Sequence, residues 1–243
     1  MQTRILLVFT GGTIGSLSEN GNIDLDPKAR FKLLELFKQR YPNSAAIDFK
    51  PVQALQILSE NLHPLDWTTL IETIESENPD AFDGIIITHG TDTLAFSASA
   101  LGLYFNHLDK PVLMVSSNLP LENPDANGIP NLIAAVDFIV QAKAVGVFVA
   151  YQNPGEILEI HQATRLSSCL PLSGDFMSIQ SKSFMRYEAG RFEQFYPLTT
   201  SAQVKVQADF SARILLVRPY PGLNYQNFNL ENIDLVLHDL YHS

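Results

Sequence analysis

The stretch ILLVF at residues 5–9 runs directly into TGGTIG at residues 10–15, and this junction decides the fold. Five consecutive apolar residues without polar alternation are typical of a strand that is buried on both faces of a parallel sheet. A second junction of the same kind joins GIII at residues 84–87 to THGTDT at residues 88–93. In open α/β sheets, the loops at the carboxyl ends of the strands form the binding crevice. The two hydroxyl-rich loops therefore predict a site for covalent chemistry on a small polar molecule.

Strand and helix patterns alternate over most of the first 150 residues. Asp26 and Pro27 indicate the start of a helix that runs to Arg40, because a capping residue precedes a proline at the first helical position. Further strands are predicted at residues 52–57, 111–115 and 145–150, and further helices from residue 64, at residues 93–107 and at residues 128–143. This order predicts an α/β fold, with a large N-terminal domain built on a mostly parallel, helix-covered sheet and right-handed crossovers.

The pattern changes in the last third of the chain. Over residues 151–191 the apolar runs are short and irregularly spaced, which indicates a hairpin and loops. We expect an N-terminal domain at residues 1–190, a polar linker at residues 191–211 and an incomplete, smaller α/β domain at residues 212–243. A single βαβ piece cannot bury both faces of its sheet, so we expect this segment to dock on the first domain or to be completed by another subunit.

Composition excludes several classes of function. Lys and Arg total 16 against 26 Asp and Glu, and the formal charge of −10 argues against nucleic-acid partners and anionic membranes. The one cysteine, Cys169, cannot form an intramolecular disulfide or a cysteine metal cluster, so we interpret it as a packing residue. The sequence contains no paired-histidine motif of the kind that would indicate a metal site. Without a secretory leader or a run long enough for a membrane helix, the sequence predicts a cytoplasmic protein.

The first glycine loop has a chemical interpretation and simpler alternatives. A threonine hydroxyl at Thr10 or Thr13 is a weak nucleophile that needs a nearby base. Gly11 and Gly12 would let backbone N–H groups approach a ligand and form an oxyanion hole. The loop is also compatible with an ordinary turn. A dinucleotide site is poorly supported, because Thr10 occupies the first glycine position of the G-x-G-x-x-G pattern.

The second loop offers a carboxylate beside a hydroxyl. Asp92 could anchor an ammonium group, and Thr91 could orient a water molecule or attack a carbonyl. Both residues are also good caps for the helix that follows. However, hydroxyl residues stand at four successive strand ends (Thr13, Ser59, Thr91 and Ser117), which is more than capping requires.

Residues 10–15 and 88–93 resemble the two signature motifs of the bacterial-type L-asparaginases, which are asparaginase/glutaminase-like amidohydrolases. The chain is most similar to the cytoplasmic type I members, and the resemblance covers nearly the whole chain but thins after Tyr151. Further similar segments are Ser59 with residues 64–67, residues 110–120, Gly128 with residues 131–132, and residues 219–222.

The resemblance implies hydrolysis of asparagine to aspartate and ammonia without a cofactor. In the family pattern Thr13 is the nucleophile that forms an acyl-enzyme, and Thr91 with Asp92 forms a second polar set. Asp92 would also hold the α-ammonium group of the substrate, and Ser59 its α-carboxylate. The remaining residues implied to line the substrate pocket are Gly12, Glu60, Gly90 and Ser117. The resemblance further implies a homo-oligomer, either a dimer or a tetramer.

Several positions depart from the family pattern. Asn22 stands where the family has a tyrosine, and Arg165 aligns with the family lysine, although Lys143 or Lys182 could approach the site instead. Arginine stays protonated, so Arg165 could orient groups but not exchange a proton. Residues 115–118 and 125–128 also differ, and the family continues beyond the position of Ser243. These departures leave a second hypothesis open: a catalytically weakened member that binds asparagine or aspartate as a sensor or scaffold.

Overall fold

The computed structural model describes residues 2–12, 14, 16–19, 22–25, 29–142, 144–198 and 206–240. Within these residues the main sheet has eight strands in the order β10-β9-β8-β7-β6-β5-β1-β4. The strands β4, β1, β5, β6 and β7 are parallel, and β8, β9 and β10 extend the sheet in antiparallel fashion. Their bounds are β1 Thr3–Gly11, β4 Ile47–Ile57, β5 Gly84–Thr88, β6 Pro111–Val115, β7 Gly146–Tyr151, β8 Leu158–Gln162, β9 Met185–Glu188 and β10 Arg191–Gln194.

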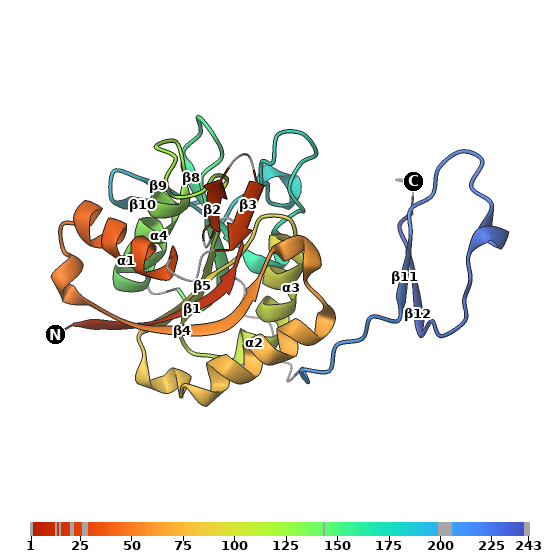
Figure 1. Cartoon of the computed structure of the whole chain (residues 1–243), viewed down its shortest axis with the longest axis horizontal. Coiled ribbons are helices and arrows are strands. Elements are labelled where there is room, and N and C mark those ends of the chain that lie inside the picture. The colour runs from red at the N-terminus through yellow and green to blue at the C-terminus, as the bar shows by residue number, and fades with distance from the viewer. Residues whose placement is uncertain are drawn as a thin grey trace.

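Helices cover both faces of this sheet (Figure 1). The helices α1 (Ala29–Arg40) and α4 (Gly128–Asp137) lie on one face, and α2 (Pro64–Ser76) and α3 (Leu94–Tyr104) lie on the other. Successive residues of β1 point to opposite faces, so Ile5 and Leu7 pack with α1 and α4 while Leu6 and Val8 pack with α2 and α3. Burial on both faces explains why the strand sequence shows no polar alternation. The predicted α/β class with a mostly parallel, helix-covered sheet is confirmed.

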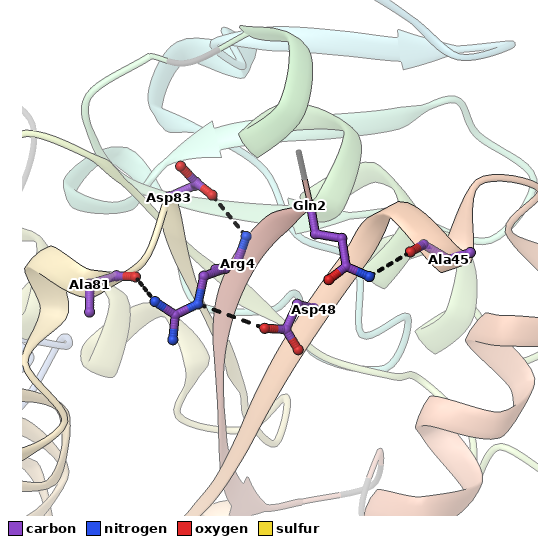
Figure 2. Close-up of polar contacts among 6 residues, drawn as sticks. All are labelled: Gln2, Arg4, Ala45, Asp48, Ala81 and Asp83. Atoms are coloured by element: carbon purple, nitrogen blue, oxygen red, sulfur yellow. Dashed lines mark hydrogen bonds and ion pairs between the residues drawn. The ribbon is translucent and has the colours of Figure 1, made fainter.

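Polar contacts fix the amino end of β1 between its two neighbours (Figure 2). The Arg4 N–H donates to Asp83 Oδ2 at 2.8 Å, and Arg4 Nη1 donates to the Ala81 carbonyl at 2.9 Å. On the other side, Arg4 Nε lies 3.7 Å from Asp48 Oδ2 on β4. One arginine therefore ties β1 both to β4 and to the turn that precedes β5.

The register of β1 against its two neighbours brings the carboxyl ends of three strands together. Phe9 of β1 pairs with Thr88 of β5, and Gly11 of β1 pairs with Ile57 of β4. The loops that follow these strands therefore start at the same edge of the sheet, as expected for the binding edge of an open α/β fold.

The antiparallel edge differs in detail from the expectation. Arg191–Gln194, expected to begin the linker, form β10 and pair with β9. The connecting residues Ala189 and Gly190 have φ of 48° and 77°, which is the left-handed geometry of a tight hairpin turn. The polar edge strands carry little hydrophobic signal, so the sequence pattern does not separate them from a linker.

Other elements extend or shorten the predicted ones. The residues before α1 include a hairpin of β2 (Ser16–Glu19) and β3 (Asn22–Leu25), whereas the predicted helix start at Asp26 and Pro27 lies outside the described residues. The helix α4 is followed by a π-helical turn at Phe138–Ala142. No helix in the described part of the chain has the length and apolar character needed to cross a membrane.

The last described segment forms a separate pair of strands. β11 (Ile214–Val217) and β12 (Leu235–His238) are parallel to each other and lie apart from the main sheet (Figure 1). The chain leading to them is anchored on α2, where the rings of Phe210 and Trp67 lie 5.3 Å apart and Thr68 Oγ1 donates to the Ala208 carbonyl at 3.1 Å. The division into domains at residues 190 and 211 stays a prediction.

Candidate active site

Three loops meet where β1, β4 and β5 end. Gly12 follows β1 with φ of +74°, and its N–H donates to the Ile57 carbonyl at 3.0 Å. A Cβ atom on Gly12 would lie 2.4 Å from the Cα of Gly90, and one on Gly90 would lie 2.4 Å from Ser59 Oγ. Only glycine permits approaches this close. The two motif glycines therefore bring the loops into direct contact over Ser59.

Ser59 and Asp92 form the polar part of this contact. Ser59 Oγ donates to Asp92 Oδ2 at 2.8 Å, and the Asp92 N–H donates back to Ser59 Oγ at 3.2 Å. Thr93 Oγ1 also donates to the Ser59 carbonyl at 3.0 Å. Ser59 is 3% exposed, whereas Asp92 is exposed. The buried serine thus holds a solvent-accessible carboxylate in a fixed position, which suits the binding of a cation such as an ammonium group.

Within the described residues, the position of the Asp92 side chain is not explained by capping of α3. The N-cap residue of α3 is Thr93, and its side chain makes no capping hydrogen bond. The described side-chain hydrogen bond of Asp92 runs to Ser59 on another loop, not to the first turn of α3. Asp92 therefore serves the contact between loops.

The position of Gly90 is also supported by His89, whose part was not predicted from the sequence. His89 is 1% exposed, and its Nδ1 lies 2.8 Å from the Gly90 carbonyl. Burial lowers the pKa of His89, against the opposing effects of the Gly90 carbonyl and the Asp92 charge. Since a carbonyl only accepts, the neutral imidazole donates from Nδ1 and holds the loop. The only sequence signal for this role is that the residue directly follows a fully buried strand.

One backbone group proposed for an oxyanion hole is already engaged. The Gly12 N–H points to Ile57 on the neighbouring strand and cannot also receive a developing oxyanion without losing that hydrogen bond. The Gly12 N–H is thus engaged in this structure, and an oxyanion hole formed by backbone N–H groups of Gly11 and Gly12 stays a prediction. The glycine at position 12 permits the close approach to Gly90.

The other predicted residues have different surroundings. Thr13 lies outside the described residues, but its neighbours Gly12 and Ile14 are both buried. Thr91 is half-buried next to Asp92, and Glu60 is exposed beside Ser59. These two residues share the loops of the Ser59–Asp92 contact, and their assignment to the site stays a prediction.

Ser117 and Arg165 have described contacts of their own. Ser117 is fully buried, its hydroxyl donates to the Leu119 carbonyl, and its side chain lies beside Gly128 at the start of α4. Arg165 Nη2 donates to the Ile179 carbonyl at 3.1 Å, and its guanidinium lies 5.9 Å from the centre of the Tyr196 ring. These contacts do not join either residue to Asp92. Lys182 is exposed, and the backbone of Asn22 lies in β3, while Lys143 is outside the described residues.

The surroundings of Asp92 include a residue that the sequence suggested only for packing. Burial and the negative charge of Asp92 both raise the pKa of the Cys169 thiol, so the loop after β8 lies near the Asp92 carboxylate. Among the described residues, no set of three or more His, Cys, Asp or Glu side chains is arranged to hold a metal ion.

Comparison with known proteins places this arrangement in a family. The family model described as "Asparaginase, N-terminal" matches residues 4–196. The solved L-asparaginase of Thermococcus kodakarensis superimposes with a TM-score of 0.81 at 25% identity, covering 99% of this chain and 71% of that one. A probable cytoplasmic L-asparaginase from Campylobacter jejuni superimposes with a TM-score of 0.72 at 26% identity, covering 92% and 68% of the two chains.

Curated relatives carry two different names. Escherichia coli L-asparaginase 1 is 34% identical over 136 residues, which cover 54% of this chain and 39% of the relative. A subunit of the glutamyl-tRNA(Gln) amidotransferase of Aeropyrum pernix is 28% identical over 233 residues, which cover 91% of this chain and 54% of the relative. The chain thus spans about half the length of the amidotransferase relatives it matches. The family model covers most of the chain, and on that match the chain belongs to the asparaginase family.

Proposed function

We propose that this chain is an amidohydrolase that releases ammonia from L-asparagine at the loops around Ser59 and Asp92. The observation that carries the proposal is the buried Ser59 hydroxyl holding an exposed Asp92 carboxylate, at the contact of the two motif glycines. Membership in the asparaginase family and the likeness to Escherichia coli L-asparaginase 1 support the same chemistry.

Binding of the amino acid would rearrange the Ser59–Asp92 pair. The Ser59 proton is donated to Asp92 Oδ2, so it is not available to a second acceptor. When the substrate ammonium pairs with the Asp92 carboxylate, the Ser59 hydroxyl can turn its proton to the substrate α-carboxylate. Both charged groups of the zwitterion would then be recognised by one pair of side chains.

The proposed reaction proceeds in two steps at the side-chain amide. The Thr13 hydroxyl oxygen attacks the amide carbon, the C–N bond breaks, and the hydroxyl proton leaves with the nitrogen as ammonia. Water then cleaves the acyl ester, which returns the proton to Thr13 and releases aspartate. Thr91 orients the attacking water beside Asp92 in this scheme. Arg165 would orient groups in this scheme and would not exchange a proton, because arginine stays protonated.

A coupled assay of ammonia release from L-asparagine and L-glutamine tests this proposal. We expect wild-type turnover of L-asparagine and a loss of about 10²-fold or more in Thr13→Ala, as for removal of a catalytic group. Thr3→Ala is the matched control, because Thr3 lies at the amino end of β1, far from the carboxyl ends of the strands where the candidate site lies. Unchanged turnover in Thr13→Ala would remove Thr13 from the mechanism.

A second candidate is amide hydrolysis within a larger assembly. The match to the Aeropyrum pernix amidotransferase protein covers 91% of this chain, compared with 54% for Escherichia coli L-asparaginase 1. In that case turnover by the isolated chain would be slow and would rise on addition of a partner protein. The departures at Asn22 and Arg165 favour a third outcome, binding without turnover. Calorimetry with L-asparagine separates these cases: binding with no ammonia released after hours indicates a binding protein.

Self-association and a cytoplasmic location are parts of the same proposal. The parallel pair of β11 and β12 leaves Leu216, Leu235 and Leu237 exposed, and parallel strands are normally covered on both faces. A second copy of the chain could cover them in a dimer or tetramer. Light scattering should then give a mass above that of one chain, and a monomer at high concentration would contradict self-association.

A further inference from the structure

A cavity lies at the carboxyl ends of β6 and β7, and β6 is the neighbour of β5, which leads into one loop of the candidate active site. Its volume is about 450 Å³, which is within the range of roughly 300–1,000 Å³ that small-molecule sites occupy. The polar part of its lining consists of Arg40, Asn118, Asp125, Asn127, Gln152 and Asn153, and we call this cavity the amide pocket. It includes none of the residues assigned above to the proposed reaction.

The wall of the amide pocket is held by hydrogen bonds between its own residues. The Asn118 N–H donates to Asn127 Oδ1 at 2.8 Å, and the Asn127 N–H donates to Asn118 Oδ1 at 3.0 Å. Asn127 Nδ2 also donates to the Gln152 carbonyl at 2.7 Å. This network joins the loop after β6 to the loop after β7, and a wall fixed in this way loses little freedom when a ligand binds.

Four polar groups of the pocket remain available to a ligand. Asn118 Nδ2 and Gln152 Oε1 make no hydrogen bond to the rest of the described chain, although the other amide atoms of both side chains are engaged. The Arg40 guanidinium and the Asp125 carboxylate are exposed, and neither forms an ion pair with any described residue. The pocket thus offers a cation, an anion, an amide donor and an amide acceptor.

This set of groups matches a small zwitterion. A guanidinium binds a carboxylate through two parallel N–H donors, and a carboxylate accepts from an ammonium group. Asn118 Nδ2 and Gln152 Oε1 can pair with a carbonyl or an amine on the remainder of the ligand. We propose that the amide pocket binds a free α-amino acid, at a site separate from Ser59 and Asp92. This inference does not depend on the proposed hydrolysis.

Calorimetric titration of the full chain with L-aspartate tests the proposal. Asp92→Asn removes the anionic group of the candidate active site and leaves the amide pocket intact. We expect one L-aspartate site to remain in Asp92→Asn. Adding Arg40→Gln should weaken that site by about tenfold or more, as expected for loss of hydrogen bonds between charged groups. Lys38→Gln, also exposed on α1 but outside the pocket, is the matched control and should leave the affinity unchanged.

The outcomes separate this inference from the proposed function. Loss of all L-aspartate binding in Asp92→Asn overturns the amide pocket as an amino-acid site, provided that circular dichroism verifies folding. An affinity that Arg40→Gln leaves unchanged in the Asp92→Asn background overturns it as well. Absence of ammonia release from the wild-type chain counts against the hydrolase alone, because the titration of Asp92→Asn does not involve turnover.

Discussion

Ser59 and Asp92 hold each other by two hydrogen bonds that run in opposite directions, across 33 residues of sequence. The serine hydroxyl donates to the carboxylate and accepts from the backbone N–H of the same aspartate. Because the serine is buried and the aspartate is exposed, the pair connects the interior of the sheet edge to solvent. The position of the carboxylate therefore depends on a side chain from a different strand end.

Ser59→Ala should leave the Asp92 N–H and carboxylate without this partner. We expect a loss of roughly 1–3 kcal/mol in the free energy of unfolding, measured by urea denaturation, because a donor and an acceptor lose a buried partner. In the proposed function, KM for L-asparagine should also rise by about tenfold. Ser76→Ala is the control, since the Ser76 hydroxyl donates to the Thr73 carbonyl of its own helix. Equal effects of the two variants would contradict a special part for Ser59.

Gly12→Ala tests the contact between the two motif loops. The new Cβ would lie 2.4 Å from the Cα and N atoms of Gly90, which are backbone atoms and cannot turn away. Gly155→Ala is a close control, because Gly155 has nearly the same φ of +75° and no atom within 4 Å of the position that a methyl group would take. The control should lose about 1–2 kcal/mol from left-handed strain alone. Gly12→Ala should lose several kcal/mol more in chemical denaturation, and equal losses would show that the contact is not rigid.

His161 should make the stability of the fold depend on pH. It is 1% exposed with Nδ1 2.9 Å from Ser178 Oγ, and burial lowers its pKa to about 4. Between this value and the usual histidine pKa, the unfolded chain binds more protons than the folded chain. Stability should therefore fall as the pH drops from about 6.5 towards 4, by on the order of 3 kcal/mol for this residue. Above pH 7 the effect should be absent.

The measurement for His161 is the slope of unfolding free energy against pH. His161→Gln should reduce the slope between pH 4 and 6.5, whatever its effect on stability at neutral pH. Part of the slope should remain, because burial lowers the pKa of His89 as well. A slope that His161→Gln leaves unchanged would contradict the assignment.

Two tyrosines should stabilise the fold by donating hydrogen bonds to the buried Asp137 carboxylate. It is 7% exposed, and it accepts from Tyr41 at 2.7 Å and from Tyr187 through its other oxygen. Burial and the Asp137 carboxylate raise the pKa of both phenols, so they remain donors. Tyr41→Phe and Tyr187→Phe should each cost about 1.5–3 kcal/mol, the value for hydrogen bonds to charged groups. Tyr220→Phe, at an exposed position, should have no measurable effect in urea denaturation.

The pair of tyrosines also predicts coupling between the two substitutions. Since the double variant leaves the buried carboxylate with neither phenol donor, its loss should exceed the sum of the single losses. Simple additivity in the double-mutant cycle would indicate that each phenol acts on its own.

Some parts of the fold could be predicted because strands that are buried on both faces have uninterrupted apolar sequences. The runs at residues 5–9, 84–87 and 111–115 are uninterrupted because both faces of these strands are covered, and all three are strands of the sheet core. The edge strand β10 is polar and short, so its pattern matches a linker equally well. Its place is set by the turn at Ala189 and Gly190 and by pairing with β9, which hydrophobicity does not report.

The candidate site shows the same division between local and tertiary information. That Ser59 and Asp92 would lie close together followed from their places at the ends of strands in one parallel sheet. The engagement of the Gly12 N–H by Ile57 depends on the register of β1 against β4, and the contact of Arg165 with Ile179 depends on how the loop after β8 folds back. Neither contact could be predicted from a local sequence pattern. The role of Thr13 stays a prediction.

The single tryptophan of the chain sits at the junction between the two described parts of the molecule. Trp67 Nε1 donates to Ser97 Oγ at 2.8 Å, and its ring meets Phe210 from the segment that leads to β11. Tryptophan fluorescence therefore comes from one known place and needs no added label. Release of that segment would remove an aromatic neighbour from the indole, so a shift in emission wavelength would follow detachment of the C-terminal strands in real time.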